Sequence, residues 1–318
     1  MKILFFGTAS VSEAFLKNLH ENRHEILCVT MPDRHAARGQ KLTPPAVKVF
    51  SQNNNIKYIQ PEKFSPEVIE TIKNFNPDAG IAVAYGKLIP ESVFTIAKYK
   101  TFNIHFSLLP KYRGAAPVQF AILNGESETG VSSFYLEKTL DTGGIILQRS
   151  CPIDIKDTSE TLFGKLIPAG IELMNGTLEC FKAGGFKVLP QQGEISYAPV
   201  IKKEDGLVNW NSGVKSIYNK IRAFYPWPGA FSIVSKGKLE NKRIKIIEAD
   251  ILEGNTVNED YGYVYSIEKN KGFSVLCAKG KLLVTKVQPE NKPVMDAWSF
   301  VHGGQIKKGD CFNQPLFV

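Results

Sequence analysis

Three side chains near the middle of the chain carry the functional groups that acyl transfer requires. Asn103 supplies an amide donor, His105 an imidazole, and Asp141 a carboxyl group in the glycine-flanked segment 140–144. When an amine attacks a carbonyl carbon, negative charge develops on the oxygen and a surplus proton remains on the nitrogen. The amide can stabilise that charge, and an imidazole beside a carboxylate can handle the proton. This set suffices for acyl transfer without a covalent enzyme intermediate.

Other chemistries have weaker support in the sequence. A zinc site needs two or three His or Cys ligands. Of the five His, only His20 and His24 have H-x-x-x-H spacing and none has H-x-H spacing, and the five Cys include no C-x-x-C pair. Ser107 could be the nucleophile of a triad, although no G-x-S-x-G turn surrounds it. Residues 7–10 lack the second and third glycines of a dinucleotide-binding loop. A purely structural role for His105 is the remaining alternative.

Strands and helices alternate in the first half of the chain. Apolar runs at residues 3–6, 25–30, 79–84 and 101–105 predict strands, and helical spacing and a Ser-Pro start signal predict helices between them. The alternation predicts an α/β fold with a doubly wound, mostly parallel, Rossmann-like sheet. Ligands of such sheets bind at the carboxyl ends of the strands, where His105 lies. The period of two along a strand places Asn103 on the same face.

The second half of the chain changes character. A Gly- and Gln-rich stretch predicts a linker at residues 189–206, and residues 214–224 have helical spacing. Short β-rich runs follow at 243–247, 262–266, 273–277 and 282–287, which predict a small, OB-like β-barrel. We therefore expect a catalytic domain at 1–188, the linker at 189–206 and a barrel domain at 207–318.

Charge is distributed unevenly along the 318 residues, whose net charge is +8. Residues 201–318 hold 18 Lys and Arg against 12 Asp and Glu, whereas residues 1–200 are nearly neutral. A basic domain on a neutral one suggests a polyanionic partner such as nucleic acid, although a lysine-rich surface alone would look the same. Residues 32–45 form a long, basic connection that could act as a lid. No apolar window approaches the ~18 residues of a membrane helix.

Several blocks together resemble the methionyl-tRNA formyltransferase family over essentially the whole chain. The strongest block is residues 107–117, Ser-Leu-Leu-Pro-Lys-Tyr-Arg-Gly-Ala-Ala-Pro, preceded by Asn103 and His105 and followed by residues 140–143. These residues are shared with the wider family that uses 10-formyltetrahydrofolate, so they indicate the reaction but not the acceptor. Residues 32–42 look like the basic loop that the tRNA enzymes place against the acceptor stem. Residues 221–230 look like the start of their barrel domain.

The resemblance implies a role for each matching residue. It makes Asn103, His105 and Asp141 catalytic. Our mechanistic hypothesis is that Asn103 and a protonated His105 stabilise the oxyanion. It assigns the folate site to Ser107, Leu108, Leu109 and Pro110, with Ala84, Tyr85 and Gly86 flanking the pterin, and tRNA contacts to Arg34, Arg38 and Lys41. The implied substrates are 10-formyltetrahydrofolate and initiator Met-tRNA, without a metal, in a cytoplasmic monomer that supports translation initiation with formylmethionine.

Two other functions stay open at this point. A folate-dependent formyltransferase could act on a small amine, such as an amino sugar nucleotide or glycinamide ribonucleotide, and would need no basic loop or basic barrel. An RNA-binding protein with a degenerate catalytic domain would need no Asn103, His105 and Asp141. The presence of both features favours a tRNA-dependent enzyme.

Overall fold

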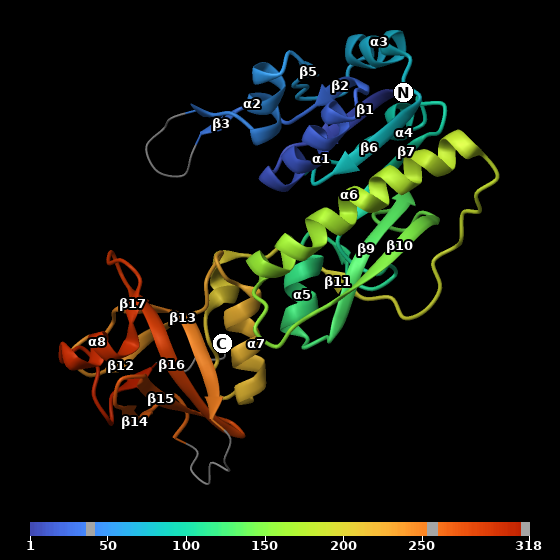
Figure 1. Ribbon diagram of the computed structural model, residues 1–318. Coiled ribbons are helices and arrows are strands. Elements are labelled where there is room, and N and C mark those ends of the chain that lie inside the picture. The colour runs from blue at the N-terminus through green and yellow to red at the C-terminus, as the bar shows by residue number, and fades with distance from the viewer. Residues whose placement is uncertain (36–41, 253–259, 313–318) are drawn as a thin grey trace. The chain divides into compact units, whose positions relative to one another are not determined.

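A seven-stranded sheet with the strand order β10-β9-β7-β6-β1-β2-β5 is the framework of the first part of the chain (Figure 1). The strands from β7 to β5 run parallel to their neighbours, whereas β9 pairs antiparallel with β7. The bounds are β1 (Lys2–Gly7), β2 (Glu25–Val29), β5 (Lys57–Ile59), β6 (Ala79–Val83), β7 (Thr101–His105), β9 (Glu128–Tyr135) and β10 (Ile145–Pro152). The predicted doubly wound, mostly parallel sheet is confirmed, with an antiparallel strand that the sequence patterns did not predict.

The computed structural model describes residues 1–35, 42–252 and 260–312. The chain divides into two compact units. The first contains residues 1–117, 129–151 and 164–198, and the second contains residues 118–128, 152–163 and 199–318. Each unit is described by itself below. The boundaries predicted from sequence, with a linker at 189–206, stay a prediction.

Different helices cover the two faces of the sheet. Phe181 of α6 (Ser159–Ala183) packs edge-on against Phe102 of β7, with ring centroids 5.6 Å apart. On the opposite face, α3 (Pro66–Phe75) and α4 (Glu91–Phe94) contribute to one buried cluster with Phe6 and Ala82. Since side chains alternate along a strand, Phe102 and Asn103 point to opposite faces. Asn103 and His105 therefore lie on the face of α3 and α4.

Shorter elements complete the first half of the chain. α1 (Ser10–Glu21) packs against β1, β2 and β6, and its N-cap is Ala9, without a side-chain cap. The Ser12 hydroxyl donates to the Val83 carbonyl at 2.6 Å, which ties α1 to β6. The remaining elements are β3 (Arg34–His35), β4 (Leu42–Thr43), α2 (Ala46–Asn53), β8 (Arg113–Gly114), α5 (Pro117–Leu123) and β11 (Tyr197–Ala198).

A curled antiparallel sheet organises the second unit, with the order β14-β15-β16-β13-β12-β18. Its ends meet where Tyr263, just before β14, pairs with Cys311 of β18. The elements are η1 (Lys203–Gly206), α7 (Val214–Ala223), β12 (Phe231–Lys236), β13 (Arg243–Leu252), β14 (Val264–Glu268), β15 (Gly272–Cys277), β16 (Gly280–Pro289), β17 (Met295–Asp296), α8 (Ala297–His302) and β18 (Cys311–Phe312). The predicted small, OB-like barrel is confirmed.

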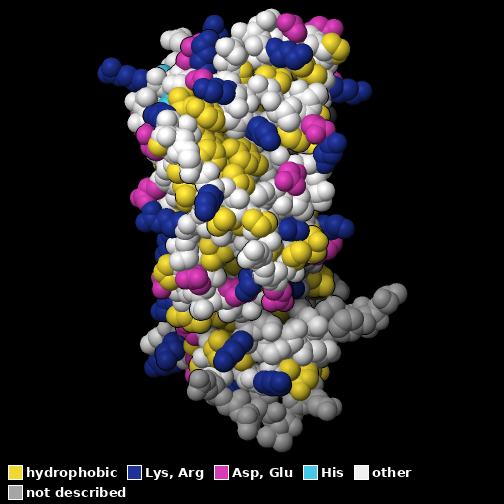
Figure 2. All heavy atoms as spheres, turned by 90° about the vertical axis from the view of Figure 1, so that its right-hand side faces the viewer, with side chains coloured by type: hydrophobic (Ala, Val, Ile, Leu, Met, Phe, Trp, Pro, Cys, Tyr) yellow, Lys and Arg dark blue, Asp and Glu magenta, His cyan; other side chains and the backbone are white. Residues whose placement is uncertain are grey.

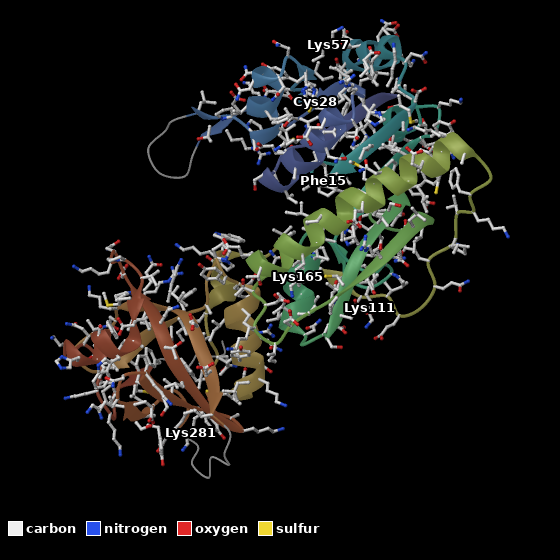
Figure 3. All side chains as sticks on the ribbon, in the orientation of Figure 1. Phe15, Cys28, Lys57, Lys111, Lys165 and Lys281 are labelled. Carbon is white, nitrogen blue, oxygen red and sulfur yellow. The ribbon has the colours of Figure 1, made fainter. Side chains whose placement is uncertain are left out.

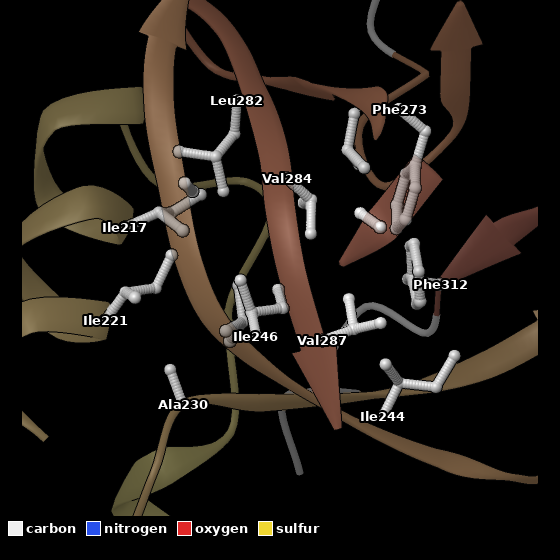
Figure 4. Packing of buried hydrophobic residues seen from close by; sticks show 14 of the residues in the cluster. Ile217, Ile221, Ala230, Ile244, Ile246, Phe273, Leu282, Val284, Val287 and Phe312 are labelled. Atoms are coloured by element: carbon white, nitrogen blue, oxygen red, sulfur yellow. The ribbon is translucent and has the colours of Figure 1, made fainter. Parts of the chain in front are cut away.

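The core of this barrel is built from the alternating inward residues of its strands. Figure 4 shows Ile246 of β13 and Leu282 and Val284 of β16 pointing into the same space, which Ile217 and Ile221 of α7 enter from the side. Trp210 is fully buried, and its indole N–H donates to the Ser232 hydroxyl at 3.0 Å. Among the helices that the structure describes, none has both the length and the apolar character of a membrane-spanning segment.

We expect Gly80→Ala to destabilise the sheet, because a Cβ at Gly80 would lie 2.1 Å from the Thr101 hydroxyl on β7. Overpacking of this kind costs about 1–3 kcal/mol. Gly164→Ala in α6 is the matched control, since no atom lies within 4 Å of the added Cβ and Ala favours a helix over Gly by roughly 0.5–1 kcal/mol. Thermal unfolding followed by circular dichroism measures both. A G80A midpoint at or above that of the unchanged protein would contradict the expected clash.

Candidate active site

The carboxyl end of β7 places Asn103 and His105 beside the antiparallel strand β9. Asn103 lies between Ala82 of β6 and Phe134 of β9, and His105 lies opposite Ser132. The His105 ring is 5% exposed and meets the Phe134 ring edge-on, with centroids 6.2 Å apart. Asn103 is half-buried, and its amide has no hydrogen-bond partner within the described ranges. The strand thus offers one buried imidazole and one amide donor on the same face.

The hydrogen bond of His105 determines which ring nitrogen can react. Nε2 lies 2.9 Å from the carbonyl oxygen of Tyr112. Because a carbonyl can only accept, Nε2 carries the proton, and in the neutral ring Nδ1 holds the lone pair. Nδ1 lies 3.9 Å from Asp141 Oδ2, which is too long for a hydrogen bond. Nδ1 is therefore not bonded to the carboxyl group and can accept a proton from a substrate.

Burial decides the charge of this ring. It lowers the pKa of His105 below its ordinary value, while the Asp141 carboxylate and the Tyr112 carbonyl oppose that shift. The direction favours a neutral imidazole near pH 7. The expectation that His105 is protonated before the reaction stays a prediction, and this direction of the pKa shift, caused by desolvation of the imidazolium, argues against it. The nearby carboxylate becomes useful once the ring has taken up a proton.

Asp141 is held in place by a backbone donor from a distant part of the chain. The N–H of Gly114, on β8, donates to Asp141 Oδ2 at 2.8 Å, and Asp141 is 7% exposed. Its backbone is left-handed, with φ of 54°, as are those of Tyr112 (61°) and Ala84 (44°). Non-glycine residues in this region are strained and persist where the surroundings fix them, often at functional sites.

The buried hydroxyl of Ser132, which sequence analysis did not single out, organises the turn after β7. Ser132 of β9 is fully buried and donates to the Ser107 carbonyl at 2.6 Å, while it accepts from Leu109 N at 3.1 Å and Gln148 Nε2 at 2.8 Å. The Ser107 hydroxyl donates to the carbonyl of Lys111, which is labelled in Figure 3, at 2.6 Å. Ser107 therefore does not donate to His105, and the arrangement does not support a serine triad.

The segment 189–198, within the predicted linker, contacts the site directly. β11 pairs in parallel with β8, and the Ser196 hydroxyl accepts from Tyr112 N at 2.9 Å. Gln191 Nε2 donates to the carbonyls of Asp141 at 2.8 Å and Gly143 at 2.9 Å. Sequence analysis missed Gln191 because its neighbours are those of an ordinary polar loop. No feature of the segment itself indicates a hydrogen-bond partner fifty residues earlier in the chain.

A pocket of about 450 Å³ is lined by residues of α4 and of the loop that carries Asp141. Its lining combines apolar side chains with polar and charged ones: Glu91, Phe94, Thr95, Lys100, Tyr135, Leu136, Glu137, Lys138, Thr139, Gly144 and Val188. The volume lies within the range of small-molecule sites.

The residues predicted for the folate site do not line this pocket. Ser107, Leu109 and Pro110 are buried and Leu108 is half-buried, so these four form the turn beside His105. Tyr85 is 4% exposed and packs on Phe6, whereas Ala84 and Gly86 are exposed after β6. Their role in binding stays a prediction. Across residues 1–35, 42–252 and 260–312, no group of His, Cys, Asp and Glu is arranged to hold a metal ion.

The predicted basic loop begins and ends as a short antiparallel pair. Arg34 of β3 is exposed and pairs with Thr43 of β4, while Arg38 and Lys41 lie outside the described residues. Asp33, just before β3, accepts from Lys48 Nζ at 2.7 Å and from Gln60 Nε2 at 2.8 Å, which fixes the base of the hairpin. On the face shown in Figure 2, basic side chains are interspersed with acidic ones and form no continuous patch.

Comparison with known proteins places these features in a family. The formyl transferase family profile matches residues 1–177, and that of the formyl transferase C-terminal domain matches residues 200–305. The chain is 60% identical over 312 residues to methionyl-tRNA formyltransferase of Endomicrobium trichonymphae, which covers 98% of this chain and 100% of that protein. It is 40% identical over 314 residues to the methionyl-tRNA formyltransferase of Thermodesulfovibrio yellowstonii, with 98% and 99% coverage.

Solved structures share the fold. A methionyl-tRNA formyltransferase from Clostridium thermocellum has a TM-score of 0.55 at 21% identity, over 79% of this chain and 94% of that one. WlaRD, a sugar 3N-formyl transferase, has a TM-score of 0.64 at 25% identity, over 92% and 99%. HypX from Aquifex aeolicus, solved with tetrahydrofolic acid, has a TM-score of 0.64 at 21% identity, over 98% and 50%. From the full-length identities and the two matching domains, the chain belongs to the methionyl-tRNA formyltransferase family.

Proposed function

We propose that this protein transfers the formyl group of 10-formyltetrahydrofolate to the α-amino group of methionine on initiator tRNA, so that translation begins with formylmethionine. One observation carries the proposal. Asn103, His105 and Asp141 converge at the carboxyl end of β7 in a formyl-transfer enzyme that is 60% identical along its length to a named methionyl-tRNA formyltransferase. The pocket beside the Asp141 loop is large enough for the ring system of the donor.

The protein's groups handle the charge and the proton. The donor supplies the formyl carbon, and the amine must be neutral to attack it. Asn103 presents an amide donor with no partner in the described part of the chain, which suits the negative charge that develops on the formyl oxygen. His105 Nδ1 accepts the proton of the attacking amine and can return it to the donor nitrogen, so that the bond between that nitrogen and the formyl carbon breaks and tetrahydrofolate leaves. Asp141, 3.9 Å away, then stabilises the imidazolium, as a carboxylate stabilises the charged histidine of a triad.

The competing small-amine function has less support. The sugar formyl transferase WlaRD shares the fold at 25% identity, well below the full-length identity to the tRNA enzyme. The basic hairpin and the +6 charge of residues 201–318 also suit a phosphate backbone, whose binding is dominated by charge. The cytoplasmic location and the monomeric state stay predictions.

We expect His105→Ala and Asn103→Ala each to lower the turnover of Met-tRNA formylation by about 100- to 1000-fold, the usual cost of losing a proton acceptor or an oxyanion donor. Lys57→Ala, on the exposed edge strand β5, is the control and should retain turnover within a few-fold. Ser107→Ala tests the serine triad separately and should not abolish turnover, because its hydroxyl donates to the Lys111 carbonyl and not to His105. The assay follows labelled formyl transfer to Met-tRNA, with amino sugar nucleotides and glycinamide ribonucleotide as alternative acceptors. Transfer to a sugar amine but not to Met-tRNA would overturn the proposal, and inactivation by S107A would revive the serine triad.

The titration of His105 tests its role as proton acceptor. Because burial lowers its pKa, the imidazole should titrate below pH ~6.5, the ordinary value for His. Asp141 opposes the shift, so Asp141→Asn should move the midpoint further down. NMR of ¹⁵N-labelled histidine measures both midpoints, with the other four His as internal controls. A midpoint above 6.5 in the unchanged protein would contradict a neutral resting imidazole and restore the protonated His105.

Replacing Arg38 with Ala should weaken the use of tRNA without changing the chemistry. We expect a higher KM for Met-tRNA. The slope of the logarithm of the tRNA binding constant against the logarithm of the salt concentration should also decrease by about one, as for loss of one phosphate contact. Lys57→Ala is the charge-matched control, since this exposed lysine lies on the outermost strand β5 (Figure 3). Equal effects of R38A and K57A on KM would remove the basic loop from the tRNA site.

A further inference from the structure

We propose that Gln191 is a positioning residue for formyl transfer, which holds the Asp141 loop so that its carboxylate faces His105. The inference rests on the proposed function, since it assigns Gln191 a part in the same reaction. Gln191 does not contact the imidazole. It acts on the backbone that carries Asp141, from a segment that follows the sheet strands in sequence.

Gln191 uses both ends of its amide. Nε2 donates to the carbonyl oxygens of Asp141 at 2.8 Å and Gly143 at 2.9 Å. Oε1 accepts from Arg113 Nε at 3.0 Å and Nη2 at 2.6 Å. Because the guanidinium can only donate, it forces the carbonyl end of Gln191 toward Arg113 and the NH₂ end toward the loop. Arg113 therefore fixes the orientation in which Gln191 can hold the two carbonyls.

The Asp141 loop needs an external support. Asp141 has a left-handed backbone, which a non-glycine residue adopts only under constraint. Gly143 approaches the Tyr135 carbonyl so closely that a Cβ would lie 1.8 Å from its oxygen, and Gly144 O accepts from Tyr135 N at 3.0 Å. These contacts hold the far end of the loop against β9. The Gln191 amide joins this end, through the Gly143 carbonyl, to the backbone of Asp141, which carries the carboxyl group.

The side chain and the backbone of Asp141 are anchored from the same short strand. Gly114 donates to the carboxyl group, and its neighbour Arg113 orients Gln191. Both belong to β8, which pairs with β11 just after Gln191 in sequence. A shift of Asp141 relative to β8 would therefore break contacts to its side chain and its main chain together. Displacements of about 1 Å at such positions can lower a rate ~100-fold.

Gln191 should consequently influence the proton affinity of His105. The groups around the ring come from three directions: the Tyr112 carbonyl at Nε2, the Phe134 ring of β9, and the carboxyl group of Asp141. Of the charged groups in the described chain, Asp141 is the one that acts on His105. If the loop moves away, the carboxylate raises the imidazole pKa less. The lowering by burial is then less opposed, and the pKa falls. The pKa of His105 then reports the position of Asp141 without any substrate.

The test combines Gln191→Ala with Gln191→Met. Met keeps most of the side-chain volume, adds no charge near His105 and cannot donate to the two carbonyls, so Q191M still tests the inference if Q191A folds poorly. We expect a turnover lower by about 10- to 100-fold with KM for Met-tRNA changed by no more than about twofold, and a His105 NMR midpoint below that of the unchanged protein. Gln192→Ala, an exposed neighbour, should change none of these.

Each alternative outcome decides against the inference. An unchanged His105 midpoint in both variants would show that Gln191 does not hold the carboxylate, whatever happens to turnover. A lower midpoint with normal turnover would show that the position is not important for the reaction. If the unchanged protein formylates a small amine instead of Met-tRNA, the proposed function fails, but the same measurements with that acceptor still test Gln191. The substrate-free titration separates the two failures.

Discussion

The hydrogen bond from Gly114 N–H to Asp141 Oδ2 is the contact on which the geometry of the site depends. It joins the turn after β7 to the loop between β9 and β10, and it sets the 3.9 Å separation between the carboxyl group and His105. A buried carboxylate without such a donor would be costly to desolvate. The bond requires β8 in its observed place, and β11 holds β8 there through a parallel pair. Residues beyond 188 are thus part of the framework of the candidate site.

Two opposing effects set the state of His105, and their balance assigns its role. Burial disfavours the imidazolium, whereas Asp141 and the Tyr112 carbonyl favour it, and burial has the larger effect. Each unit of pKa corresponds to about 1.4 kcal/mol between the two protonation states. A ring that rests neutral but has a carboxylate nearby gains stabilisation when a proton arrives. That difference between resting and reacting states is what acceleration of a reaction requires.

The parts of the fold that sequence predicts are those whose signals are local. The strand at Thr101–His105 has the predicted bounds, because a strand buried in a parallel sheet consists of a short apolar run. β9 was missed, since its core includes Thr129, Ser132 and Ser133, whose hydroxyls are buried. Asn103 and His105 could be paired from strand alternation alone. Gln191 could not, because its partners lie about fifty residues away and depend on the β8–β11 pairing.

The arrangement also separates the reaction from the choice of acceptor. WlaRD formylates a sugar and shares this architecture, so the sheet and its covering helices do not by themselves select tRNA. A sugar amine and an aminoacyl-tRNA present the same nucleophile, a primary amine, and differ in the size and charge of what carries it. Discrimination must then come from groups that reach a polyanion outside the reacting centre. In this chain, two parts carry the positive charge that binding of a polyanion requires. They are the basic segment 34–43, whose base Asp33 and Lys48 fix, and the basic residues after 200.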